Sequence, residues 1–246
     1  MSEATAIVTC MTDAERPFVT DALASVVSQT AACDIIVVAE EANTWIEELC
    51  VPFPGVEILR RPVGPPGACR NSGIAAAKTE FVAFLDGDDV WLPTKIEKQL
   101  NVMERGERDF VGVDHMLMTE SGAVFAYALA RNIPMTSSWM VRREIMLRRP
   151  FDPDLWVGED GAWWIATLDE VEKWRVPEPL THYRVRDGSL SGGTKSKRRK
   201  AALAELSALP LARPLLMAAT WALHSVTERE TYLPLNEWRG SPAQEA

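Results

Sequence analysis

Several features that would place this chain in other classes are absent. Basic residues do not predominate: among 246 residues, 26 Lys and Arg stand against 35 Asp and Glu, which gives a formal net charge of −9. A general nucleic-acid binder usually needs a basic surface for phosphate contacts, so no nucleic-acid partner is expected. No stretch reaches the roughly 18 apolar residues of a membrane span, and the first residues do not resemble a secretory signal. We therefore expect a soluble, cytoplasmic protein.

Cysteine is scarce and follows no metal-binding pattern. The four cysteines lie in the first third of the chain without a CxxC or CxxH spacing: Cys10, Cys33, Cys50 and Cys69. Reduced, mostly buried thiols are therefore expected rather than a zinc site or a disulfide framework. Because 47% of the residues are hydrophobic, the chain can bury an ordinary core without such a staple.

What the sequence does contain is an alternation of strand and helix patterns over about the first 110 residues. Short β-favouring runs lie at 6–10, 35–38, 56–59, 81–85 and 110–113, and helical patterns lie between them at 18–27, 68–78 and 96–103. This alternation predicts an α/β fold with a mostly parallel sheet flanked by helices. In such sheets, ligands bind at the carboxyl ends of the strands.

The pattern loosens beyond Met116. A hairpin is expected around 120–122, a strand near 137–141, and a helix beginning at 158–160. After Ser191 a basic run at 195–200 precedes a Leu- and Ala-rich segment that Pro210 and Pro214 interrupt.

The sharpest chemical feature is the acidic cluster Asp86-Gly87-Asp88-Asp89 at the end of an apolar run. Three carboxylates this close repel one another unless they share a cation, and hard oxygen ligands suit Mg²⁺ or Mn²⁺. An Asp-rich solvated turn is the alternative. The place at a strand end favours a site.

A Gly/Pro-rich loop at 64–67 leads into the helix that carries Arg70 and Asn71. Backbone N–H groups at a helix start, together with a guanidinium, can bind a phosphate. Taken alone, the segment also fits a plain loop-to-helix junction with a surface arginine.

The two motifs in this order resemble glycosyltransferase family 2. The sequence GPPGACRNSGI from Gly64 and the sequence EFVAFLDGDDVWLPTKI from Glu80 are similar to the family's ARNxG helix and FLDxDDxWxPxKL segment, and weaker similarity spans about 5–191. The resemblance implies a GT-A fold and an inverting transfer of a single sugar. The donor would be a nucleotide diphosphate sugar, the acceptor a hydroxyl on a saccharide, lipid-linked carrier or small molecule, and the cofactor Mg²⁺ or Mn²⁺.

The resemblance also assigns roles to single residues. Asp86 would contact the ribose of the donor, Asp88 would bind the metal with Asp89 in support, and Arg70 would face the diphosphate. Asp160 would be the general base and Glu159 would orient it or bind the acceptor, although acids at a helix start are also ordinary. Further donor contacts are expected from Thr9, Glu40 and Arg186, and acceptor contacts from Trp156, Trp163 and Trp164, of which Trp164 also fits a core position.

The chain departs from the family pattern in three places. Glu40 lies in Ala-Glu-Glu-Ala where many members have Asp-Asp-Gly-Ser, which leaves the base of the nucleotide open. Arg186 stands where many members have a histidine that helps bind metal or phosphate, so it can pair directly with the diphosphate. The QxxRW segment of processive members is absent, which favours transfer of one sugar.

Three parts of the chain are expected on this basis. Residues 1–115 would form the nucleotide-sugar-binding half of one GT-A domain, residues 116–192 its acceptor-binding half, and residues 193–246 a basic loop with a helical C-terminal tail. The tail could contact an anionic membrane surface or pack on the domain or across a homodimer. The two prolines favour packing, because they interrupt a long amphipathic face.

Other functions remain open from the sequence. A sugar nucleotidyltransferase shares the architecture, but the residues after the first strand do not resemble its GxGTRL-like loop. A glycosidase also uses paired carboxylates, yet would leave the phosphate loop without a role. A catalytically silent glycosyltransferase-like subunit is a third alternative, because Glu40 and Arg186 depart from the family pattern.

Overall fold

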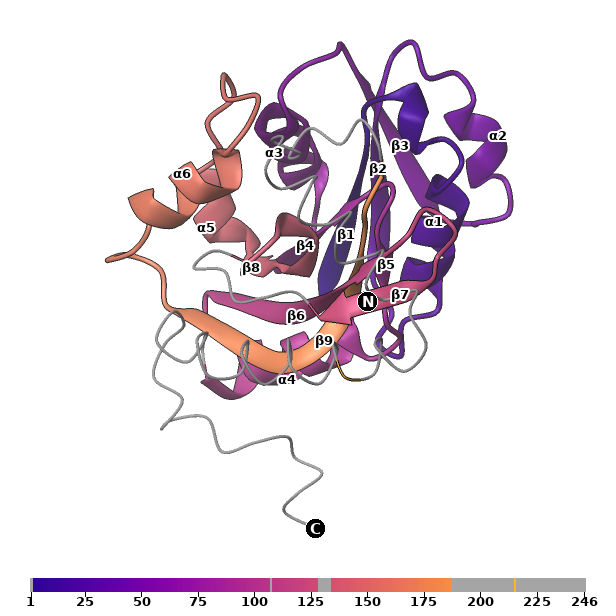
Figure 1. The fold of residues 1–246 in the computed structure, drawn as a ribbon. Helices are drawn as coiled ribbons and strands as arrows, with labels where there is room; N and C mark the ends of the chain where they lie inside the picture. Colours follow the sequence, from indigo (N-terminus) through magenta and orange to yellow (C-terminus); the bar gives the residue numbers. More distant parts are fainter. Residues whose placement is uncertain (1, 107, 128–133, 187–214, 216–246) are drawn as a thin grey trace.

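Four parallel strands form the first half of a mixed sheet (Figure 1). The computed structural model describes residues 2–106, 108–127, 134–186 and 215. Strands β1 (Ala4–Cys10), β2 (Asp34–Glu40), β3 (Val56–Arg61) and β4 (Phe81–Asp86) lie in the order β3-β2-β1-β4. Each is a short apolar run, and β1 is buried along its whole length, as a central strand covered on both faces should be.

Helices connect these strands and cover the sheet. They are α1 (Val19–Val27), α2 (Ile46–Cys50), α3 (Pro66–Ala76) and α4 (Lys95–Gly106), with a short 3-10 turn, η1 (Asp13–Glu15), after β1. Pro66 lies in the first turn of α3, where its missing N–H has no helical partner to lose.

The second half of the sheet is mixed. Strands β6 (Phe110–Met118) and β9 (Lys173–Arg184) pair in parallel, and the short β8 (Met140–Arg142) lies antiparallel between β4 and β6. The main order is therefore β3-β2-β1-β4-β8-β6-β9-β5, with β5 (Val90–Trp91) antiparallel to β9 and β7 (Val124–Tyr127) paired with β6. The remaining elements are η2 (Thr136–Ser138), α5 (Arg143–Arg148) and α6 (Glu159–Ala166).

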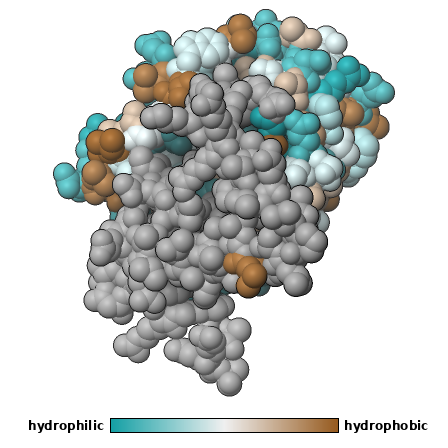
Figure 2. Space-filling model, viewed as in Figure 1, coloured by the Kyte–Doolittle hydropathy of each residue, from teal (hydrophilic) through white to brown (hydrophobic). Residues whose placement is uncertain are grey.

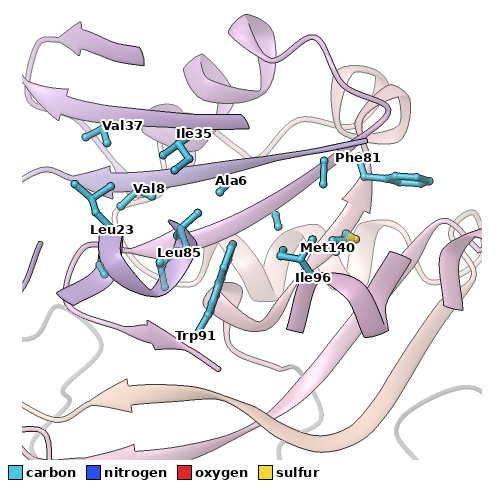
Figure 3. Packing of buried hydrophobic residues seen from close by; sticks show 14 of the residues in the cluster. Ala6, Val8, Leu23, Ile35, Val37, Phe81, Leu85, Trp91, Ile96 and Met140 are labelled. Carbon is cyan, nitrogen blue, oxygen red and sulfur yellow. The ribbon is translucent and has the colours of Figure 1, made fainter. Parts of the chain in front are cut away.

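Alternating side chains of β1 enter two separate cores. Ala6 and Val8 pack in the cluster under α1, α2 and α4, while Ile7 packs in the cluster under α3, α5 and α6. Figure 3 shows part of the first cluster, where Val8, Leu23 and Leu85 come together from β1, α1 and β4. Both faces of the central sheet are thus covered by helices, as the α/β pattern predicts.

The expected strands and helices are found in the fold, with their ends shifted by a few residues. The predicted hairpin is confirmed by β6 and β7, and the predicted helix by α6. The strand expected at 137–141 begins only at Met140, because residues 136–138 form η2. The boundary expected at residue 115 falls inside β6. The expected tail, 193–246, lies outside the described residues apart from Leu215.

No helix in the described part of the chain is both long enough and apolar enough to span a bilayer.

Candidate active site

A cavity of about 300 Å³ lies at the carboxyl ends of β1 and β4. Its walls come from both halves of the sheet and from the first turns of α3 and α6. The lining residues are Thr9, Met11, Thr12, Glu15, Pro66, Arg70, Asp86, Asp88, His115, Met135, Thr136, Trp156, Val157, Gly158, Glu159, Asp160, Tyr183 and Arg186. Most residues expected in a donor or catalytic site therefore meet in one place.

Arg70 joins the two halves of the site. Its Nη2 donates to Asp86 Oδ1 at 2.7 Å, and its Nη1 donates to Glu159 Oε1 at 2.5 Å. The Arg70 side chain is 5% exposed and that of Glu159 is 9% exposed, so their contact is shielded from water, whereas Asp86 is 34% exposed. Burial alone would lower the pKa of Arg70, but the two carboxylates outweigh it and raise the pKa, which keeps the guanidinium charged.

Two glycines of α3 allow the helix to come this close. A Cβ on Gly73 would lie 2.5 Å from Ile7 Cγ2, and a Cβ on Gly67 would lie 2.9 Å from the Asp152 carbonyl oxygen. Both distances are shorter than real Cβ contacts. The motif around Arg70 therefore carries glycine where the helix packs on β1 and on the segment that leads to α6.

Asp86 is held at the end of β4 by β1. Thr9 Oγ1 donates to Asp86 Oδ1 at 3.0 Å, and the Gly87 N–H donates to the Thr9 carbonyl at 2.9 Å. A Cβ on Gly87 would approach that same carbonyl oxygen to 2.9 Å. Gly87 thus lets the acidic loop fold against β1, and the Asp86 carboxylate stays about one-third exposed in the cavity.

Asp89 points away from the cavity. It is fully buried, Ser137 Oγ donates to its Oδ2 at 2.6 Å, and the Arg184 N–H donates to its Oδ1 at 2.9 Å. Burial raises the pKa of Asp89 well above its usual range, and Asp88 and Asp86 add to that effect. The metal role expected for Asp89 is therefore not supported, because its oxygens tie the acidic loop to η2 and β9.

Asp88 lines the cavity and is paired with an arginine. Arg186 Nε donates to Asp88 Oδ2 at 2.5 Å, and Arg186 Nη2 lies 3.8 Å from Glu15 Oε1. Burial raises the pKa of Asp88 and Asp86 adds to this, while Arg186 opposes both. The arginine that replaces the family's histidine thus lies beside the second aspartate of the acidic cluster.

Glu159 and Asp160 begin α6 with different environments. Gly158 precedes them with a φ of 86°, a conformation that favours glycine, and so turns the chain into the helix. Glu159 is buried against Arg70, whereas Asp160 is partly exposed and accepts the Gly161 N–H at 2.7 Å through Oδ1. Of the two acids, Asp160 is the one whose carboxylate is not paired with Arg70.

The three tryptophans expected to bind the acceptor separate into two groups. Trp163 and Trp164 are 4% and 5% exposed and belong to the core with Phe110 and Trp139. This corrects the expectation of acceptor contacts for them. Trp156 is 53% exposed and lines the cavity. In Figure 2, apolar surface appears over the part of the molecule where α6 lies in Figure 1. Of the exposed apolar residues, Ile165 belongs to α6 and Leu168 follows its end.

The donor set fits a divalent cation incompletely. Only Asp86 and Asp88 of the acidic cluster reach the cavity, and each already has a guanidinium partner. Across the described residues, no three His, Cys, Asp or Glu side chains are close enough together to hold a metal ion. The carboxylates are of the right chemical type for Mg²⁺ or Mn²⁺, but the arginines occupy one oxygen of each.

The sequence did not identify three further residues of the site, which are Glu15, Thr136 and Ser137. Glu15 lines the cavity and accepts the Thr12 N–H at 2.8 Å, and its position three residues after a threonine matches a capping box. Ser137 Oγ donates a hydrogen bond to Asp89 and accepts one from the Asp86 N–H at 3.1 Å. Ser137 and Asp86 are 51 residues apart in the sequence, so no local pattern connects them. Thr136 lines the cavity next to Ser137. By contrast, Glu40 is not among the residues that line the cavity.

Known proteins place the chain among glycosyltransferases. It matches the family model described as Glycosyl transferase family 2 over residues 5–164. An uncharacterized glycosyltransferase of Nostoc sp. is 30% identical over 68% of this chain and 61% of its own length. The UDP-Glc:alpha-D-GlcNAc-diphosphoundecaprenol beta-1,3-glucosyltransferase WfaP of Escherichia coli is 33% identical over 52% of this chain and 54% of its own length. The alignments thus span little more than half of these relatives.

Solved structures give the same fold. The Staphylococcus aureus TarS fragment 1-349, crystallised in complex with UDP-GlcNAc, superposes with a TM-score of 0.67 over 100% of this chain and 78% of its own, at 14% identity. This likeness confirms the expected GT-A architecture, since it extends over both halves of the sheet. Because the family model covers well over half of the sequence, this chain belongs to glycosyltransferase family 2.

Proposed function

We propose that this chain is an inverting glycosyltransferase that moves one sugar from a nucleotide diphosphate sugar to a hydroxyl acceptor. The observation that carries the proposal is the convergence of Arg70, Asp86, Asp88 and Asp160 on one cavity at the carboxyl ends of β1 and β4. Ligands of open α/β sheets bind at such strand ends.

The donor would lie against the first half of the sheet. Asp86 is the ribose ligand in this proposal, since its partly exposed carboxylate lies in the cavity and is fixed by Thr9 and Arg70. Arg70 and Arg186 would place positive charge near the diphosphate, where a guanidinium suits phosphate oxygens. Reading of the base by Glu40 stays a prediction.

Asp160 would act as the general base. It lines the cavity, and it lacks the arginine partner that holds Glu159. A carboxylate that removes the acceptor proton while the anomeric carbon is attacked in line gives a single displacement, and a single displacement inverts the anomeric centre. Glu159 would be a positioning residue, because its contact with Arg70 fixes the start of α6.

The acceptor would enter past Trp156. This indole is exposed at the cavity wall next to Gly158 and Asp160, and an exposed aromatic face can stack on a sugar ring. The name of the E. coli relative specifies a diphosphoundecaprenol-linked saccharide, so a lipid-linked saccharide is one acceptor class to test. A peripheral membrane contact or a homodimer through residues 193–246 stays a prediction.

The metal predicted from the sequence stays a prediction, because the residues of the site fit a divalent cation incompletely. Asp88 is the side chain that would hold Mg²⁺ or Mn²⁺, and a bound cation would neutralise charge on the departing diphosphate. Its Oδ2 is already paired with Arg186, and Asp89 lies outside the cavity. The transfer described above therefore uses the chain's own residues alone.

The test measures release of nucleoside diphosphate from a panel of nucleotide diphosphate sugars, with water taking the sugar in place of the unidentified acceptor. We expect one donor to be consumed, and we expect Asp160→Asn to lower the rate by about 10²–10⁴-fold, the usual contribution of a general base. Nucleoside diphosphate affinity should stay unchanged, since Asp160 acts on the acceptor.

Asp154→Asn is the matched control, because Asp154 is an exposed aspartate in the segment before the same helix. It should keep full activity. If no donor in the panel is consumed while a nucleoside diphosphate still binds, the chain is instead a catalytically silent binding subunit.

A further inference from the structure

We propose that the Arg186 guanidinium takes the place of a divalent cation beside Asp88, so that this chain binds the diphosphate of its donor without metal. The inference rests on the proposed function and concerns how its site is neutralised. It starts from the contact between Arg186 and the second aspartate of the acidic cluster.

Arg186 lies beside Asp88, where the sequence predicts a metal ion. Its Nε donates to Asp88 Oδ2 at 2.5 Å, and its Nη2 lies 3.8 Å from Glu15 Oε1. The side chains of Asp88 and Arg186 are only 13% and 11% exposed, so water screens this pair weakly. The guanidinium therefore lies between the Asp88 carboxylate and the side chain of Glu15 on the cavity wall.

The backbone fixes Arg186 in this place. Two residues earlier, the Arg184 N–H donates to Asp89 Oδ1 and Arg184 Nε donates to the Asp88 carbonyl at 2.8 Å. Between them, the Val185 N–H donates to the Met118 carbonyl at 2.8 Å. The end of β9 is thus tied to both the acidic loop and β6, which positions the following arginine.

The charges of the acidic cluster are matched by this arrangement. Asp86 pairs with Arg70, Asp88 pairs with Arg186, and the third carboxylate, Asp89, is buried with Ser137 and a backbone N–H as partners. A divalent cation at Asp88 would meet the guanidinium at short range and would be repelled by it. The three aspartates of the acidic cluster would repel one another without a cation. In the structure, Arg70, Arg186 and Ser137 reduce that repulsion.

Arginine can hold Asp88 and a diphosphate together. A guanidinium has five N–H donors in a planar fork, so its Nε can bond the carboxylate while other donors address phosphate oxygens. Arg186 lines the same cavity as Arg70. The two arginines would then contact the diphosphate from the second and the first half of the sheet.

Calorimetric titration of the full chain tests this with UDP, GDP, ADP and CDP, each in excess EDTA and again in Mn²⁺. We expect the nucleotide that binds most tightly to show affinities within about threefold in the two conditions. Arg186→His should bind at least about tenfold more weakly in EDTA, which is the loss expected for one charged hydrogen bond, and should regain affinity in Mn²⁺. Arg186→Lys keeps the charge and should bind in EDTA more tightly than Arg186→His.

Arg149→His is the control, because Arg149 is 54% exposed and pairs with Glu170 away from the cavity. It should behave as the wild type. The electron paramagnetic resonance signal of Mn²⁺ gives an independent readout: with the nucleotide present, Mn²⁺ should be immobilised by Arg186→His and not by the wild type.

Wild-type binding that is at least about tenfold tighter in Mn²⁺ overturns the inference and leaves the proposed function standing. Equal affinity of Arg186→His and wild type in EDTA also overturns it. If no nucleoside diphosphate binds in either condition, the proposed function fails and this inference fails with it.

Discussion

The two halves of the sheet build the cavity in different ways. In the first half, the cavity side chains follow directly from parallel strands and their helices: Thr9 and Asp86 lie at the carboxyl ends of β1 and β4, and Arg70 lies in the first turns of α3. In the second half, the chain turns back on itself, and β8 runs antiparallel between β4 and β6.

The charges of the site are balanced only across the junction between the halves. Arg70 of the first half holds Glu159 of the second, and Arg186 of the second half holds Asp88 of the first. Each half alone would carry a buried or half-buried charge without its partner, which is costly. We therefore expect the site to form only when the two halves are docked.

Replacing Arg70 should break this junction with the largest effect. Arg70→Met leaves Asp86 and Glu159 without their shared partner, and removal of one member of a buried pair costs about 3–5 kcal/mol. We expect a loss of that size in the free energy of unfolding and a loss of nucleoside diphosphate binding. Urea unfolding and calorimetry measure the two.

Arg143→Met is the control, because Arg143 contacts only backbone carbonyls of α3 in the described structure. It should lose much less stability. Equal losses in the two variants would contradict a special role for the cross-half ion pairs.

Mutations of two tryptophans in the second half distinguish a core residue from a cavity residue. Trp163→Ala removes a buried indole and its hydrogen bond to the Arg149 carbonyl, which should cost about 3–5 kcal/mol of unfolding free energy. Trp156→Ala should change stability by less than about 0.5 kcal/mol, since the side chain is exposed, but should raise the KM for the acceptor. Thermal unfolding and initial rates distinguish the two, and a stability loss of similar size in both would contradict the assignment.

The difference between the two halves of the sheet explains which parts of the fold and site could be predicted from the sequence. The first half follows from local signals, because each strand is an apolar run and each functional group lies within a few residues of a strand end or helix start. The alternation of strands and helices there, and the places of Arg70 and Asp86 at a helix start and a strand end, were therefore predictable. The start of α6 was predictable for the same reason.

The rest depends on contacts between distant residues. Asp89 resembles its two neighbours in sequence, and only the contacts with Ser137 and the Arg184 backbone show that it faces inward. Trp163 and Trp164 share a helix with the predicted base. The sequence left a core position open for Trp164, and the packing of α6 on Phe110 and Trp139 assigns both indoles to the core. Such long-range partners leave no periodic signal in a single sequence.

Mutations can therefore distinguish the aspartate that stabilises the fold from the aspartate that binds the donor. Asp89→Ala leaves the Ser137 hydroxyl and the Arg184 N–H without their buried acceptor, and each unsatisfied group costs about 1–3 kcal/mol. Asp86→Ala should cost less stability, because its carboxylate is 34% exposed, but should weaken nucleoside diphosphate binding by more than about tenfold. A reversed pattern, with Asp86 dominating stability, would contradict the division.

Glu15 provides the smallest test of how the halves share charge, since it lies on the first half and faces Arg186 of the second. Burial raises the pKa of Glu15 from 4.5 to about 8, against the hydrogen bond from the Thr12 N–H, which lowers it. The folded chain therefore keeps this proton where the unfolded chain has lost it. For this group, stability is highest below about pH 4.5, falls as the pH rises from there to about 8, and is constant above.

Glu15→Gln removes that titration and keeps an oxygen that can accept the Thr12 N–H, so its stability should exceed that of the wild type by about 1–2 kcal/mol more at pH 8 than at pH 6.5. Urea unfolding at both pH values measures the difference. Asp13→Asn, an exposed acid of the same 3-10 turn, should follow the wild-type profile. Parallel profiles for wild type and Glu15→Gln would mean that Arg186 keeps Glu15 ionised. In that case the first half would present a third negative charge to the second, and the balance across the junction would require a cation beyond the two arginines.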